Sequence, residues 1–106
     1  MAAALVAVVK GYSIDDIERA AEIALEHQLG LTCDPVEGYV QIPCIERNAV
    51  AALRALESAS LVELFGDRNS KISFDVVVET MRQTGLDLNR NYRETSQGGL
   101  ARNYKE

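Results

Sequence analysis

Two cysteines, Cys33 and Cys44, are the side chains of this sequence best suited to metal or nucleophilic chemistry. Ten residues separate them, and each lies near a proline that restricts the local backbone. Cys44 directly precedes a predicted helix, where free N–H groups and the helix dipole favour a thiolate. The spacing matches none of the short C-x2-C pairs of zinc sites and ferredoxin-type clusters. From spacing alone, metal ligation and a pair of buried structural thiols both remain open.

Two other features could take part in chemistry. His27 is the only histidine and lies on an amphipathic helix six residues before Cys33. It is either an acid–base residue or an ordinary hydrogen-bonded side chain. Near the C-terminus, Ser96 is followed by Gln97 and then by Gly98 and Gly99. A hydroxyl followed by two glycines can form a backbone nest that holds an anion, and a flexible turn is the alternative.

Helices must position these residues, because apolar side chains recur every three or four residues along most of the chain. The apolar run over residues 1–9 predicts a core helix whose front is cut off. Ser13 is typical of an N-cap and opens the next helix, with Gly30 as the C′ residue. The predicted inner face of that helix consists of Ile14, Ile17, Ala21, Ala24 and Leu25.

Two more helices follow the first cysteine. One is predicted from Ile45 towards Leu64, with Gly66 at its end and a polar loop over 66–70. Its periodic side chains are Ile45, Ala49, Ala52, Leu53, Leu56, Ser60 and Leu64. Ser73 caps the other helix, which stops at Gly85 and has an inner face of Phe74, Val77, Val78 and Met81.

Two segments lack the helical pattern. Residues 31–43 contain two prolines and predict an ordered loop that carries Cys33 and ends at Cys44. Residues 89–106 are rich in Asn, Arg and Gly and predict a polar tail. The sequence therefore predicts one small all-α domain over residues 1–106, with a cysteine-bearing loop and a polar C-terminal tail.

Composition narrows the class of protein. The chain has 106 residues, of which 47% are hydrophobic and 25% charged, values typical of one globular domain and not of a disordered chain. The net charge of −5 argues against nucleic acid as a partner, because phosphate binding needs clustered positive charge. The apolar run at the start is too short to span a bilayer and lacks the basic flank of a signal peptide. We therefore expect a soluble, cytoplasmic protein with no membrane partner.

Several runs of residues occur together in one known family. These are Glu26-His27, Leu29 to Val36 with its Leu-Thr-Cys-Asp-Pro, and Val40 to Asn48 with its Ile-Pro-Cys-Ile-Glu-Arg-Asn, followed by Val78 to Met81 and by Tyr92 to Leu100. The chain resembles the iron–sulfur L-serine dehydratases over about residues 1–101. The resemblance covers the C-terminal part of the catalytic α domain of that family.

The resemblance implies a lyase of amino-acid catabolism and gluconeogenesis that converts L-serine to pyruvate and ammonia with a [4Fe–4S] cluster. Cys33 and Cys44 match two of the three cysteines that bind the cluster. The third lies in a segment of the family that this chain does not contain. The implied partners are the rest of the α domain, the β domain and L-serine, and the chain alone is expected to be inactive. The rival hypothesis is a non-enzymatic helical assembly module with structural thiols.

A substrate site can be placed on the same residues. Arg47 follows Cys44 by one helical turn, and its guanidinium can bind a carboxylate such as that of serine through two hydrogen bonds. We expect Arg47, Asn48, Ser96, Gly98 and Gly99 at the edge of this site. An ion pair between Arg47 and a neighbouring acid is the alternative. The chain departs from many family members in having Gln28 instead of a second histidine and Glu37 instead of glycine.

Overall fold

The described part of the chain folds into helices without a sheet. The computed structural model describes residues 1–66, 71–95 and 97–104. These residues form five α-helices and two short 3-10 helices, and their only β pairing is one isolated bridge. The elements are α1 (Ala2–Val9), α2 (Ile14–Glu26), η1 (Val36–Gly38), α3 (Cys44–Phe65), α4 (Phe74–Asp87), η2 (Arg90–Tyr92) and α5 (Gly99–Asn103). The all-α prediction is confirmed.

Local capping explains where the helices begin. The Ser13 hydroxyl accepts a hydrogen bond from the Asp16 amide, and the Ser73 hydroxyl accepts one from the Val76 amide, so both predicted N-caps are confirmed. The predicted end of α3 at Gly66 is confirmed, but the ends of α2 and α4 differ from the predictions. α2 ends at Glu26, and a turn then leads to Gly30, whose φ of +69° favours glycine. α4 runs through Gly85 to Asp87, because one glycine in a final turn costs only about 1 kcal/mol.

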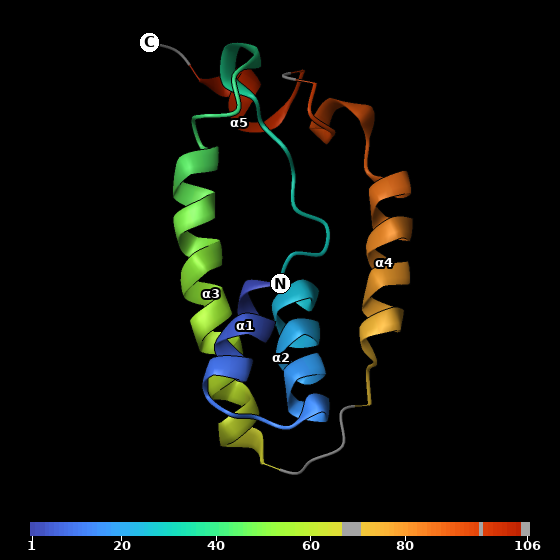
Figure 1. The fold of residues 1–106 in the computed structure, drawn as a ribbon. Coiled ribbons are helices and arrows are strands. Elements are labelled where there is room, and N and C mark those ends of the chain that lie inside the picture. Colours follow the sequence, from blue (N-terminus) through green and yellow to red (C-terminus); the bar gives the residue numbers. More distant parts are fainter. Residues whose placement is uncertain (67–70, 96, 105–106) are drawn as a thin grey trace.

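Small side chains bring the first three helices together. Figure 1 shows α1 and α2 beside the lower half of α3, with α4 on the far side of α2. The buried residues of this core are mostly alanine and allow close approach of the helix backbones: Ala3, Ala7, Ala20, Ile23, Ala55, Ala59 and Val62. The predicted N-terminal helix is confirmed, and it contributes Ala3 and Ala7.

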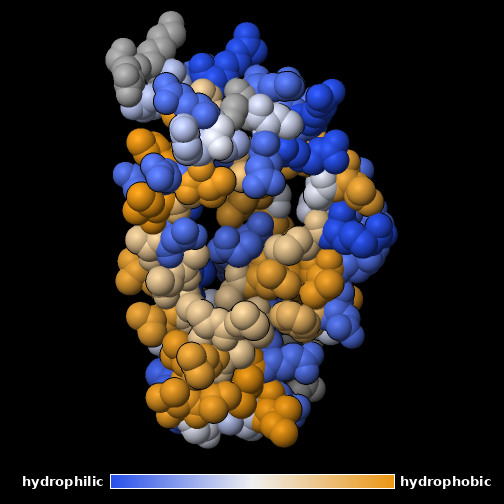
Figure 2. Space-filling model, turned by 45° about the horizontal axis from the view of Figure 1, so that its top comes forward, coloured by the Kyte–Doolittle hydropathy of each residue, from blue (hydrophilic) through white to orange (hydrophobic). Residues whose placement is uncertain are grey.

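The predicted inner faces of three helices are partly wrong. In α4, Val77 is buried as predicted, but Val78 is 45% exposed. In α2, Ile14 is 83% exposed, although Ile17 and Ala24 pack against the core. In α3, Leu53 is 66% exposed, and Ile45, Leu56 and Leu64 are exposed as well. α1 and α2 pack instead against the α3 face that carries Ala55, Ser58, Ala59 and Val62. As a result much apolar surface stays open, visible as orange flanks in Figure 2.

The polar tail contains helices that the sequence pattern did not predict. Residues 90–92 form η2 and residues 99–103 form α5, which packs against η1. Neither segment has an apolar period from which a helix could be predicted. Contacts with the cysteine loop hold both segments in place. Four residues of the predicted polar loop, 67–70, lie outside the described residues. Within the described chain, no helix is both long enough and apolar enough to cross a membrane.

Candidate functional site

The cysteine loop is an ordered segment that connects α2 to α3. It runs upward from α2, forms η1 next to α5, and turns into the start of α3 (Figure 1). The Cys33 amide donates a 3.0 Å hydrogen bond to the Tyr92 carbonyl, within the isolated parallel bridge between Cys33 and Arg93. The loop therefore gains a partner from the C-terminal segment, and the prediction that it is ordered is confirmed.

The two cysteines occupy opposite ends of this loop. Cys33 lies in the bridge, and Cys44 is the first residue of α3, after the N-cap residue Pro43. Both thiols are free and half-buried. Burial raises the pKa of the Cys33 thiol, and the charges of Glu94 and Cys44 raise this pKa further. Arg47, three residues after Cys44, bonds Asp34, the residue after Cys33, at 2.7 Å, so the fold brings together the backbone segments that carry the two cysteines.

A buried aspartate lies beside the first cysteine. Asp34 is only 1% exposed and accepts three hydrogen bonds. Its Oδ2 accepts from the Thr32 hydroxyl at 2.9 Å and from Arg47 Nη2 at 2.7 Å, and its Oδ1 accepts from the Leu100 amide at 2.9 Å. Burial favours the neutral acid, but these hydrogen bonds outweigh burial and lower the pKa of Asp34. The site therefore holds a buried carboxylate with every donor supplied by the chain.

Arg47 ties the start of α3 to the loop. Its Nη1 donates to the Thr32 carbonyl at 2.9 Å while its Nη2 donates to Asp34. The structure thus shows the ion pair that was the alternative to a substrate contact for this residue. The Arg47 side chain is 37% exposed, and the adjacent Asn48 is exposed too.

Gly99 lies against the same carboxylate. Gly99 has a φ of +58°, and a Cβ at this position would overlap Asp34 Oδ1. A Cβ on Gly98 would come within 2.9 Å of the Asn91 carbonyl. Arg47 and the glycine segment therefore do converge on one carboxylate, and in this structure that carboxylate belongs to Asp34. Ser96 lies outside the described residues, and a substrate role for this set stays a prediction.

His27 is placed at the C-cap of α2. Its Nδ1 lies 2.7 Å from the Ile23 carbonyl, so its hydrogen bond falls within its own helix. No hydrogen bond of the described residues joins His27 to either cysteine. A catalytic role for His27 stays a prediction.

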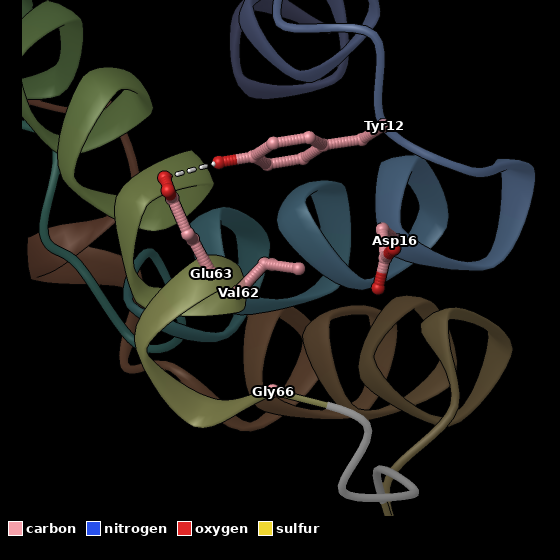
Figure 3. A pocket seen from close by; sticks show the side chains of 5 residues that line it. All are labelled: Tyr12, Asp16, Val62, Glu63 and Gly66. Carbon is pink, nitrogen blue, oxygen red and sulfur yellow. Dashed lines mark hydrogen bonds between the residues drawn. The ribbon is translucent and has the colours of Figure 1, made fainter.

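The described residues do not by themselves complete a metal site. No three His, Cys, Asp or Glu side chains among them gather closely enough to hold a metal ion. Figure 3 shows a pocket of about 240 Å³ between the α1–α2 turn and the end of α3, where the Tyr12 hydroxyl donates to Glu63 at 2.9 Å. A second pocket of about 300 Å³ is lined by parts of α1, α2 and α3 together with Phe74. Neither pocket is lined by residues of the cysteine loop.

Asp34 is the site residue that the sequence reasoning missed. A signal for it exists, because it stands between Cys33 and Pro35 in a loop that must be rigid. An acid in such a constrained position needs donors close by. The sequence does not show where those donors lie, since the Leu100 amide is 66 residues away along the chain.

Known proteins match this chain closely. The family model described as serine dehydratase alpha chain matches residues 1–101. An L-serine dehydratase of Streptomyces coelicolor is 53% identical over all 106 residues, which cover 23% of that protein. Those of Haemophilus influenzae and Escherichia coli (L-serine dehydratase 1) are 55% and 54% identical over 101 residues, or 95% of this chain and 22% of each relative. The chain thus spans less than a quarter of the length of these relatives, and it belongs to the serine dehydratase alpha-chain family.

Proposed function

We propose that this chain forms part of the active site of an iron–sulfur L-serine dehydratase, which converts L-serine to pyruvate and ammonia. The observation that carries the proposal is the 2.7 Å ion pair between Asp34 and Arg47, which joins the two segments that carry the free thiols of Cys33 and Cys44. The identity with proteins named L-serine dehydratase supports it.

The donor set suits part of a [4Fe–4S] cluster. Thiolates are the ligands of such clusters, and Cys33 and Cys44 would supply two of them. Further donors would come from outside the described residues, which offer no third side chain to the same site. When bound, the cluster supplies an iron that acts as a Lewis acid towards the hydroxyl and carboxylate of the substrate.

The chain's own residues would bind the substrate and move its proton. Two N–H donors of Arg47 bind Thr32 and Asp34, and a guanidinium has five, so others remain for the carboxylate of serine. Asn48, Ser96, Gly98 and Gly99 would line the same edge.

His27 is the candidate proton acceptor. Because its Nδ1 faces the Ile23 carbonyl, Nδ1 carries the proton and Nε2 is left as the basic atom. A neutral imidazole nitrogen of this kind can accept the α-proton of an amino acid. His27 would reach the substrate only in the assembled enzyme, since its hydrogen bond here lies within α2.

The exposed face of α3 supports a partner. Ile45, Leu53 and Leu56 are more than half exposed, and Val50 is too. Single exposed apolar side chains are common, but several on one face of a helix mark an interaction surface. Ile45, Leu53 and Leu56 form such a row, because 3.6 residues per turn places them within about 80° of one another around α3. We propose that the rest of the α domain covers this row, that the β domain completes the enzyme, and that the chain alone is inactive.

Anaerobic reconstitution tests the proposal. The chain is combined with the remaining segments of a related L-serine dehydratase, supplied with iron and sulfide, and assayed for bound iron and for pyruvate. We expect Cys33→Ser and Cys44→Ser each to lose bound iron and activity, while Ser60→Ala on the exposed side of α3 keeps both. Full iron binding by the cysteine variants would contradict the proposal. That result would favour the alternative function, a non-enzymatic assembly module, which the exposed apolar row of α3 supports.

A further inference from the structure

We propose that Asp34 is the positioning residue of the two-cysteine site, because its carboxylate fixes the start of α3 and the C-terminal segment relative to Cys33. The inference rests on the proposed function for its biological meaning. Its structural content, however, depends only on contacts within this chain.

Asp34 and Arg47 link the two segments that carry the cysteines. Asp34 follows Cys33 directly, and Arg47 lies one helical turn after Cys44. The Asp34–Arg47 ion pair, at 2.7 Å, therefore joins the two backbone segments that carry the thiols. The second bond of Arg47, to the Thr32 carbonyl, reaches the other side of Cys33. Together these bonds hold Cys33 in a fixed position relative to the first turn of α3.

Asp34 also binds the C-terminal strap, which we define as residues 97–104. Its Leu100 amide donates to Asp34 Oδ1, and Gly99 approaches that oxygen so closely that no Cβ fits. The strap thus lies directly on the carboxylate that binds Arg47. One carboxylate is shared by the cysteine loop, α3 and the strap, so its loss weakens the contacts among all three.

Only a carboxylate can accept all three of these hydrogen bonds. All three hydrogen-bond partners of Asp34 are donors: the Thr32 hydroxyl, the Arg47 guanidinium and the Leu100 amide. Asparagine has the same shape, but its NH2 group would face at least one of these donors. Asp34→Asn therefore breaks the network without changing the packed volume.

Thiol cross-linking tests the positioning role. The reduced 106-residue chain is treated with a short bis-maleimide, and mass spectrometry gives the fraction in which Cys33 and Cys44 are joined. We expect Asp34→Asn to lower the cross-linked fraction relative to single alkylation about tenfold, the effect of losing one charged hydrogen bond. The control Asp75→Asn, which removes the same charge from exposed α4, should match the unmodified chain.

A second measurement follows the strap. Amide hydrogen exchange at Leu100 should become at least about tenfold faster in Asp34→Asn, because its acceptor is weakened. Gly99→Ala should have a similar effect when Asp34 is present and a smaller one in an Asp34→Ala background, where the overlap is gone. Gly11→Ala is the matched control, since Gly11 also has a positive φ but nothing within 4 Å of its added Cβ.

The outcomes separate this inference from the proposed function. Unchanged cross-linking and unchanged Leu100 exchange in Asp34→Asn would overturn the positioning role. So would an equal loss of cross-linking in Gly11→Ala, because general destabilisation would then explain the effect. Neither readout needs iron or serine, so the reconstitution experiment judges the dehydratase proposal independently.

Discussion

Glu22 is a buried acid whose replacement should stabilise the fold at neutral pH. It lies in α2, is only 4% exposed, and its Oε1 has no hydrogen-bond partner among the described residues. Burial raises the pKa of Glu22, and the neighbouring Glu26 raises it further, while Arg19 and His27 oppose the shift. A folded-state pKa above the unfolded value means that protonation favours folding. The contribution of Glu22 to stability is therefore complete below about pH 4.5 and is lost as pH rises through the higher folded-state pKa.

Glu22→Gln keeps the shape and removes this proton linkage. A buried polar group without a partner costs about 1–3 kcal/mol, and the amide keeps part of that cost. We therefore expect a gain of about 1 kcal/mol in the free energy of unfolding at pH 7, or about 4–8 °C in the thermal midpoint. Towards pH 4 the acid becomes mostly neutral in both states, so most of the gain should vanish.

Thermal and urea unfolding followed by circular dichroism at pH 4 and pH 7 measures both values. Glu18→Gln is the matched control, because Glu18 is an exposed acid on the same helix and its loss changes the net charge equally. The reasoning fails if Glu22→Gln is no more stable than the unmodified chain at pH 7. It also fails if the gain is the same at the two pH values.

Three further predictions concern the cysteine loop and its contacts. Glu37 has a φ of +54°, so Glu37→Gly should remove strain of about 1 kcal/mol and raise the thermal midpoint, and a lower midpoint would contradict this. Glu94 raises the pKa of Cys33, so Glu94→Gln should lower that pKa and speed alkylation of Cys33 at pH 8 about twofold. An unchanged alkylation rate would refute the electrostatic effect of Glu94 on Cys33. Arg47→Lys keeps the charge, but lysine cannot bind Thr32 and Asp34 with the two arms of a guanidinium. We expect urea unfolding to show a loss of about 1 kcal/mol in the free energy of unfolding. An unchanged urea midpoint would show that the paired hydrogen bonds of Arg47 do not stabilise the fold.

The structure gives a physical reason for a glycine at position 37. The resemblance to the L-serine dehydratases implies a glycine where this chain has Glu37. At this position η1 requires a left-handed backbone, which glycine adopts without strain and glutamate does not. The physical reason for the glycine is thus visible only once the loop is folded.

The sequence by itself determined where α2 and α4 begin and where α3 ends. Ser13 and Ser73 predict helix starts, and the structure confirms both, because a capping hydroxyl bonds an amide only three residues away. Gly66 predicts the end of α3 for a similarly local reason. The cysteine motifs indicate the family, since they too depend only on the order of residues.

Tertiary structure alone decided which surfaces meet. The pattern of α3 favours burial of Leu53 and Leu56, yet α1 and α2 pack against Ala55 and Ala59, whose small side chains let the backbones approach. Periodicity ranks faces by hydrophobicity and cannot show which face has a partner. Asp34 is the clearest case, because its charge is stabilised by donors from α3 and from a segment 66 residues away. Bonds over such separations form only when the whole chain has folded, so no local pattern predicts them.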